Sequence, residues 1–79
     1  MDRKIKVIWE SSGPDAEETA KHHAIHLGEF GVREKLELSI EGTEYLSHIT
    51  WIAYLIVFEK DTIKVRDALK PLRAEIFED

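Results

Sequence analysis

The chain has no cysteine among its 79 residues. Disulfide bonds, cysteine nucleophiles and cysteine-held zinc or iron–sulfur centres are therefore excluded. Proline and glycine are also scarce, at two and four residues, and neither gathers into a tract that would mark a linker. No internal repeat is present, so nothing supports a solenoid. We expect a single small domain spanning residues 1–79.

Long hydrophobic runs are missing as well. The longest, residues 49–58, has about ten residues, whereas a membrane-spanning helix needs about 20. The N-terminus alternates apolar and basic residues in place of the apolar core of a signal peptide. We therefore expect a mature, soluble protein of the cytoplasm that has no membrane partner.

Positive charge is in the minority, because 11 Lys and Arg stand against 16 Asp and Glu, for a net charge of −5. Nucleic-acid binding draws on clustered basic side chains, so we expect no nucleic-acid partner. A protein with a basic surface is the more natural partner for an acidic chain. Apolar residues make up 43% of the sequence, which is enough for a globular core.

Alternating hydrophobic residues predict a strand over residues 4–10, with Ile5, Val7 and Trp9 on its inner face. Residues 11–15 combine serine, glycine, proline and aspartate, and such clusters start helices. A helix is therefore expected over residues 14–27. Its inner face has mainly small side chains at spacings of three and four, which permit close packing on a sheet. These residues are Ala16, Ala20, His23, Ala24 and Leu27.

Two more strands are predicted after this helix, which we expect Gly28 or Gly31 to end. Apolar and polar residues alternate over residues 36–41, and Gly42 is expected to mark the turn that follows. Residues 48–58 are apolar on both faces and rich in β-branched and aromatic side chains, as is typical of a central strand.

Two alternatives remain for the segment after Phe58. In the favoured one, Asp61 or Thr62 caps a helix that Pro71 kinks or ends, and residues 74–77 form a short final strand. In the other, residues 59–62 form a hairpin turn, residues 63–65 a strand, and a last helix begins near Pro71.

These elements predict an α+β domain, a two-layer sandwich in the order βαββα(β). Both helices would lie on one face of a mainly antiparallel sheet, and the favoured order is that of the ferredoxin-like plan. Many unrelated proteins share this order of elements, so it predicts no activity.

Three histidines lie within two turns of the first helix. His22 and His26 are four residues apart, so both can face the same metal ion, and a third ligand would come from Glu18, from Glu29 or from the more distant His48. Two ligands do not make a metal site, and the H-E-x-x-H motif is absent. The simpler interpretation is that His22 and His26 are solvated while His23 packs beside the alanines.

Sequence signals for catalysis are weak. Neither phosphate-binding glycine motif is present, and Asp15, Glu17 and Glu18 lie where a phosphate would bind. Ser47 and His48 are adjacent in sequence, but neighbouring side chains of a strand point to opposite faces. We therefore expect neither an enzyme nor a cofactor.

Ile25 lies on the outer side of the helix among charged residues, where a monomer would normally carry a polar side chain. Together with Phe77 it indicates an interaction surface. The first hypothesis is therefore a non-catalytic protein-binding or regulatory module, whose partner is another protein or a second copy in a homodimer. The alternatives are a metal-binding protein that uses the histidine cluster, and an oligomeric ligand-binding protein or enzyme. The pocket of the latter would form at a subunit interface from Trp51, Tyr54 and His48.

Overall fold

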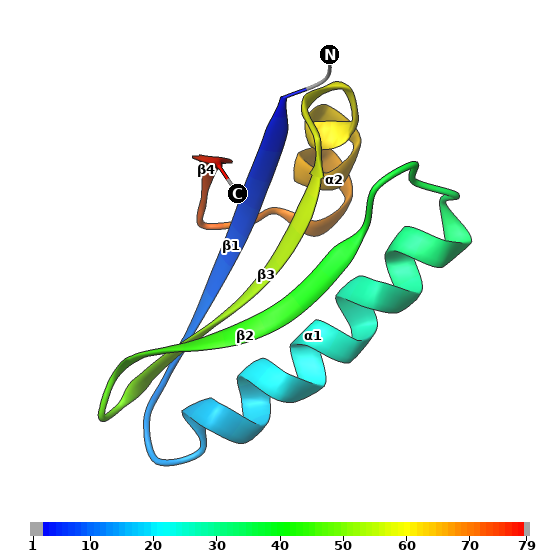
Figure 1. The fold of residues 1–79 in the computed structure, drawn as a ribbon. Coiled ribbons are helices and arrows are strands. Elements are labelled where there is room, and N and C mark those ends of the chain that lie inside the picture. The colour runs from blue at the N-terminus through cyan, green and yellow to red at the C-terminus, as the bar shows by residue number, and fades with distance from the viewer. Residues whose placement is uncertain (1–2, 79) are drawn as a thin grey trace.

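Four strands, two helices and one 3₁₀ turn make up residues 3–78, the part of the chain that the structure, a computed structural model, describes (Figure 1). In chain order they are β1 (Lys4–Ser12), α1 (Ala16–Arg33), β2 (Ile40–Ser47), β3 (Thr50–Phe58), the turn η1 (Glu59–Asp61), α2 (Thr62–Leu69) and β4 (Arg73–Phe77).

The strands form one sheet in the order β2-β3-β1-β4, in which all neighbours are antiparallel. β1 and β3 pair over their full length, from Lys4 opposite Phe58 to Ser12 opposite Thr50. β3 therefore has a strand on either side, as its two apolar faces predicted. β2 and β4 are the two edges of the sheet.

The hydrophobic core lies between the sheet and α1. The odd-numbered residues of β1 and β3 point into it, which confirms the predicted inner face of β1. Val65 of α2 belongs to the same cluster, so both helices pack on the same face of the sheet. The cluster consists of Ile5, Val7, Trp9, Ala20, Ala24, Leu27, Phe30, Ala53, Leu55, Val57 and Val65.

The small-residue face of α1 is buried as predicted, but the expected end of the helix at Leu27 is wrong. Phe30, which is 4% exposed, continues the apolar stripe by another turn, and the helix runs on to Arg33. Gly28 and Gly31 therefore lie inside α1 and do not end it.

Close approach between α1 and the chain that follows it explains these glycines. A β carbon on Gly31 would overlap the side chain of Ser39, and one on Gly28 would lie 2.9 Å from the carboxyl carbon of Glu41. Helix and strand can come this close because both positions lack a side chain.

The predicted bounds of the second strand, residues 36–41, are also wrong, because β2 begins only at Ile40 and runs on to Ser47. The longer α1 is followed by a turn at Lys35, which has a positive φ of 55°, and Leu36 then packs against the core from a loop. Gly42, expected as a turn, lies within β2. A side chain at Gly42 would overlap the ring of Tyr54 on β3.

After Phe58 the favoured alternative is confirmed, since α2 and β4 follow in that order. Lys70 adopts a left-handed conformation that ends α2, and Pro71 comes directly after it. The α+β class is therefore confirmed, with two helices and a four-stranded antiparallel sheet.

The two helices differ in extent. α1 has 18 residues and lies along β2 and β3, whereas α2 has eight residues and lies near the far end of β3 (Figure 1). Within residues 3–78, neither helix has the length and apolar character that crossing a membrane requires.

Candidate functional site

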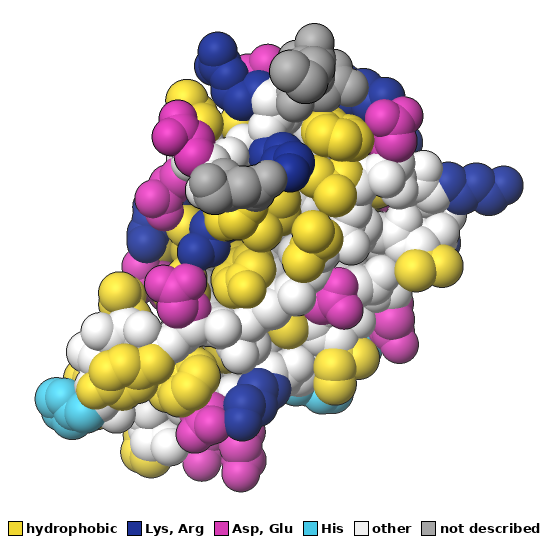
Figure 2. All heavy atoms as spheres, in the orientation of Figure 1, with side chains coloured by type: hydrophobic (Ala, Val, Ile, Leu, Met, Phe, Trp, Pro, Cys, Tyr) yellow, Lys and Arg dark blue, Asp and Glu magenta, His cyan; other side chains and the backbone are white. Residues whose placement is uncertain are grey.

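Large hydrophobic side chains are exposed at the end of the β2–β3 hairpin, where His48 and Ile49 form a two-residue turn. Tyr45 is 59% exposed, Leu46 50% and Ile49 48%. Figure 2 shows hydrophobic side chains gathered at this end of the molecule, at the lower left. Tyr45, Leu46 and Ile49 are called the hairpin-end cluster below.

A β-bulge interrupts β2 within this cluster. The register shifts between Tyr45 and Ser47, which leaves Leu46 without a partner on β3. A bulge breaks the alternation of a strand and redirects its side chains. The ring of Tyr45 meets Trp51 edge-on, with centroids 5.8 Å apart, so the cluster rests on a packed aromatic pair.

Charged residues of α1 border the hairpin-end cluster. The amide of Gly13, just before α1, donates a hydrogen bond of 2.8 Å to the carbonyl of Ile49, so the start of the helix lies beside the hairpin. Lys21 lies 5.9 Å from the ring centroid of Trp51 and binds Glu17 at 2.7 Å. Glu18 joins Glu17 in the first turn of α1, so this border carries more acid than base.

His22 and His26 meet on the exposed side of α1. Their Nε2 atoms are 3.0 Å apart, and Nδ1 of His26 lies 3.1 Å from a carboxylate oxygen of Glu29. A carboxylate on one ring nitrogen favours a proton there and leaves the other nitrogen free to accept or coordinate. The predicted pair therefore forms, although both rings are open to solvent.

His48, the third candidate histidine ligand, lies in the hairpin turn and does not join this pair. Within residues 3–78, no group of three or more histidine, aspartate or glutamate residues is arranged to hold a metal ion. The structure thus brings together two of the three candidate histidine ligands.

His23 faces the core side of α1, as predicted, and its ring meets Trp9 edge-on with centroids 5.3 Å apart. Burial lowers the pKa of His23, and the nearby charge of His26 lowers it further. The neutral imidazole is therefore favoured at this position.

The residues predicted for a subunit-interface pocket do not lie together in one chain. Trp51 packs against the core on the helix side of β3, whereas Tyr54 belongs to the opposite face, where Lys6 lies over its ring at 4.6 Å. His48 is at the hairpin turn. A single chain therefore offers no pocket lined by all three residues.

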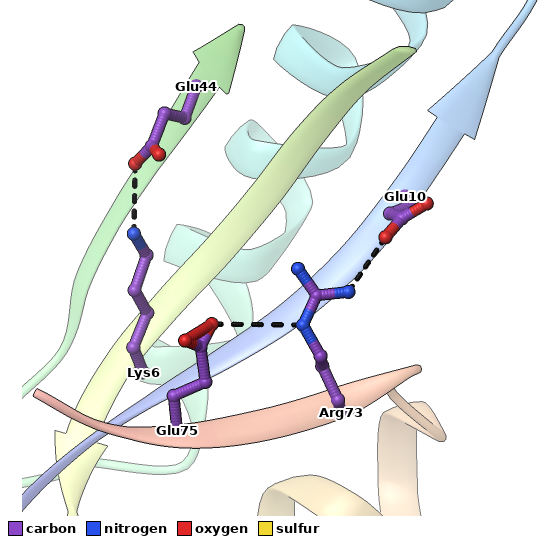
Figure 3. Close-up of polar contacts among 5 residues, drawn as sticks. All are labelled: Lys6, Glu10, Glu44, Arg73 and Glu75. Atoms are coloured by element: carbon purple, nitrogen blue, oxygen red, sulfur yellow. Dashed lines mark hydrogen bonds and ion pairs between the residues drawn. The ribbon is translucent and has the colours of Figure 1, made fainter. Parts of the chain in front are cut away.

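Charged side chains lie over the sheet face opposite the helices (Figure 3). Lys6 binds Glu44 at 2.9 Å, and Arg73 binds Glu10 at 2.7 Å. A further contact of 3.7 Å joins Arg73 to Glu75. The hydrogen bond with Glu10 raises the pKa of Arg73, which therefore stays positively charged.

Three isoleucines are buried on this face although neither helix covers it. Ile8 is 1% exposed, Ile52 3% and Ile56 4%. The aliphatic stems of long charged side chains can cover apolar surface while their charged ends remain in water. We attribute the burial of these isoleucines to that cover, which includes Lys6 and Arg73.

Ile25 is 59% exposed, as the helical pattern predicted, and Phe77 is half-buried at the end of β4. Ile25 lines an open hollow of about 800 Å³ between α1 and the start of β2, together with Val32 and Leu36. Charges of both signs border the hollow, so it has no single chemical character. The interaction role of Ile25 and Phe77 stays a prediction.

The hairpin-end cluster was not predicted from the sequence. One signal for it was present, because Tyr45 and Leu46 are adjacent and neighbouring strand residues point to opposite faces, so both cannot pack on the helix side of the sheet. The second edge of the sheet, β4, was expected as a strand but not as an exposed one. Comparison with known protein families, curated proteins and solved structures finds no match for this chain.

Proposed function

We propose that this chain is a small, soluble, non-catalytic protein-binding module of the cytoplasm, and that it binds its partner through the hairpin-end cluster. The observation that carries this proposal is the exposure of Tyr45, Leu46 and Ile49, three large hydrophobic residues at the end of the β2–β3 hairpin. Contiguous exposed apolar groups with a polar border are typical of protein-contact surfaces, and tyrosine is enriched at their centres.

The chemistry of the remaining surface supports binding over catalysis. Within residues 3–78, no polar or charged residue is fully buried. Catalytic groups usually occupy enclosed sites that perturb their pKa values and exclude water. The hollow beside Ile25 is wide open to solvent and is not such an enclosed site.

The partner we propose is a protein that presents an apolar patch with a basic border. Glu17 and Glu18 lie in the first turn of α1, just after the Gly13 amide that bonds to the hairpin, and the chain as a whole carries a net charge of −5. Complementary charge at the border would speed association, while the buried apolar contacts would supply most of the affinity.

For the finer architecture, we propose the ferredoxin-like plan with a reduced second half. The βαββαβ order, the antiparallel pairing and the shared core face of the two helices support this assignment. The eight-residue α2 and the exposed β4 depart from a regular plan of this kind.

Quantitative capture with matched variants tests the proposed function. The immobilised wild type is compared with Tyr45→Ser/Ile49→Ser and with a control, Val32→Ser/Ile63→Ser, which also replaces two exposed hydrophobic residues. A captured protein is then purified and titrated against all three forms. We expect the hairpin variant to bind at least about tenfold more weakly, a loss of about 1.4 kcal/mol, and the control to bind like the wild type.

Two results would oppose this proposal. The first is an equal loss of affinity in both double variants, which would place the contact elsewhere or implicate general destabilisation. The second is the absence of any protein that binds the purified wild type saturably. Circular dichroism of each variant establishes that it is folded before binding is compared.

A second candidate function is weak binding of a transition metal by His22 and His26. Zinc lies about 2.0–2.1 Å from each histidine nitrogen, so two nitrogens on one tetrahedral ion are about 3.3–3.4 Å apart. The observed Nε2–Nε2 distance of 3.0 Å is close to this spacing, so a small rotation of the rings would admit an ion, and Glu29 is placed to support His26 through Nδ1.

Calorimetric titration with Zn²⁺ and Ni²⁺ tests this candidate. We expect saturable binding of one ion per chain that is lost in His22→Ala and retained in His48→Ala. Binding retained without His22, or no binding to the wild type, rejects the histidine pair as a metal site.

A further inference from the structure

β4 is an edge strand whose outer side has no neighbour among residues 3–78 (Figure 1). All its residues except Phe77 are exposed. Edge strands usually avoid chance pairing through charge, proline or cover from another element. β4 has no proline inside it, and its exposed side chains include Ile76.

Two backbone hydrogen bonds settle which residues of β1 bond to which neighbour. The amide of Glu59 donates to the carbonyl of Arg3 at 2.7 Å, and the amide of Gly13 donates to that of Ile49 at 2.8 Å. Both bonds continue the β1–β3 register, and bonded pairs alternate along an antiparallel ladder. Odd-numbered residues of β1 therefore bond to β3, and even-numbered ones bond to β4.

This alternation fixes the outer edge of β4. The β4 residues that lie opposite even-numbered residues of β1 are Arg73, Glu75 and Phe77. Their backbone amide and carbonyl groups therefore point toward β1. The amide and carbonyl groups of Ala74 and Ile76 point away from the sheet, where an additional strand could bond to them.

The side chains along this edge are apolar on one face. Leu72 is 61% exposed and Ile76 57%, with Ala74 between them. Leu72 and Ala74 line a small hollow together with Val7, on the helix side of the sheet. Figure 2 shows hydrophobic side chains gathered around β4 and α2.

We propose that β4 pairs with β4 of a second copy of this chain, antiparallel and centred on Ala74. In this register Arg73 stands opposite Glu75 of the second copy, and Leu72 stands opposite Ile76. The two-fold axis repeats both pairs, so the surface is complementary to itself. The pairing joins two four-stranded sheets into one continuous sheet and does not involve the hairpin-end cluster.

Charge selects this register over its neighbours. If the pairing were centred on Glu75, the two Glu75 carboxylates would lie directly opposite each other. If it were centred on Arg73, the two Arg73 guanidinium groups would lie directly opposite each other. Like charges in directly opposed positions destabilise a sheet, and opposite charges stabilise it. Among these registers, the one centred on Ala74 sets Arg73 against Glu75.

The hydrogen bonds follow from the same register. Each Ala74 amide donates to the Ala74 carbonyl of the other copy. The Leu72 amide is already used within the chain, since it donates to the carbonyl of Ile8 at 2.9 Å. A contact limited to one short strand is small for a stable dimer, so the dimer forms in a concentration-dependent equilibrium.

Disulfide trapping tests the register directly, because the chain has no cysteine of its own. Directly opposed, hydrogen-bonded residues have α carbons about 5.5 Å apart, within the range that a disulfide spans. Ala74→Cys is therefore expected to form a covalent dimer under mild oxidation. In the control Ile76→Cys, the two cysteines would lie about 13 Å apart, and trapping should be at least tenfold slower.

Charge reversal provides a test without cysteine. Arg73→Glu alone opposes two glutamates and Glu75→Arg alone opposes two arginines, so each variant should be monomeric at a concentration at which the wild type is dimeric. Mixing the two variants restores opposite charges in both pairs, and light scattering should then give the mass of a dimer.

Several outcomes would overturn the proposal. They are a wild type that stays monomeric up to millimolar concentration, equal trapping at positions 74 and 76, or no dimer after the two charge variants are mixed. Circular dichroism must first show that each variant is folded, because the absence of a dimer in an unfolded variant does not test the pairing.

Discussion

The indole nitrogen Nε1 of Trp9 donates a hydrogen bond of 3.0 Å to the carbonyl oxygen of Leu69. The two residues lie on β1 and at the end of α2, 60 positions apart in the chain. A carbonyl in the last turn of a helix has no partner within that helix, so the indole satisfies it. Because Val65 is the one fully buried residue of α2, this bond is a principal attachment of the helix to the sheet.

Replacing Trp9 with phenylalanine should therefore destabilise the fold. Trp9→Phe removes the bond to Leu69 and part of a buried ring, for an expected loss of about 2 kcal/mol in the free energy of unfolding. Trp51→Phe makes the same chemical change at a half-buried position and should cost less than about 1 kcal/mol. Urea unfolding of both variants measures the difference, and equal losses would contradict this role of Trp9.

The two glycines inside α1 should respond to alanine in opposite directions. Gly28→Ala meets only the flexible end of Glu41, so helix propensity should dominate and stabilise the protein by about 0.5–1 kcal/mol. Gly31→Ala meets the β carbon of Ser39, which cannot move away independently of its backbone, and should destabilise it by about 1–3 kcal/mol. Thermal melts compare them, and stabilisation by both would refute the close approach at Ser39.

Lys6 should stabilise the sheet more through its stem than through its charge. Lys6→Ala would uncover apolar surface near Ile8 and Tyr54, at a cost of about 1 kcal/mol. Glu44→Gln keeps the cover and weakens only an exposed ion pair, which should change stability by less than about 0.5 kcal/mol. Denaturant midpoints distinguish the two contributions, and a larger effect of Glu44→Gln would show that charge dominates.

His23 should make the fold less stable in mild acid. Its pKa in the folded state lies below its value of about 6.5 in the unfolded chain, so the unfolded state binds protons more readily. The stability that neutral His23 contributes is fully present above its pKa in the unfolded chain. It is lost as the pH falls through its lower pKa in the folded state. His23→Gln should reduce the loss of stability between pH 7.5 and pH 5, whereas the exposed control His48→Gln should not. An unchanged pH profile in His23→Gln would contradict this role.

Local patterns predicted the inner faces of β1 and α1 correctly, because alternation and helical spacing report directly on burial. The boundaries of α1 and β2 could not be obtained in this way. Glycine ends helices but also permits close approach, and only the positions of Ser39 and Glu41 in space decide between these roles. Gly42 illustrates the same difficulty, since the ring that requires it belongs to Tyr54 on another strand.

The candidate sites also differ in how far the sequence predicted them. The approach of His22 and His26 followed from helical geometry alone. The exposure of Leu46 depends on a bulge that one sequence does not reveal. The free edge of β4 depends on the order of strands in the sheet, which is a long-range property.

Photo-crosslinking in cells tests directly whether the hairpin-end cluster contacts another protein. A photoreactive phenylalanine analogue replaces Tyr45 in one form of the protein and Val32, which is 80% exposed, in a control form. We predict a specific protein adduct at position 45 that is absent at position 32. Equal adducts at the two positions, or none at position 45, would show that the hairpin-end cluster does not make this contact.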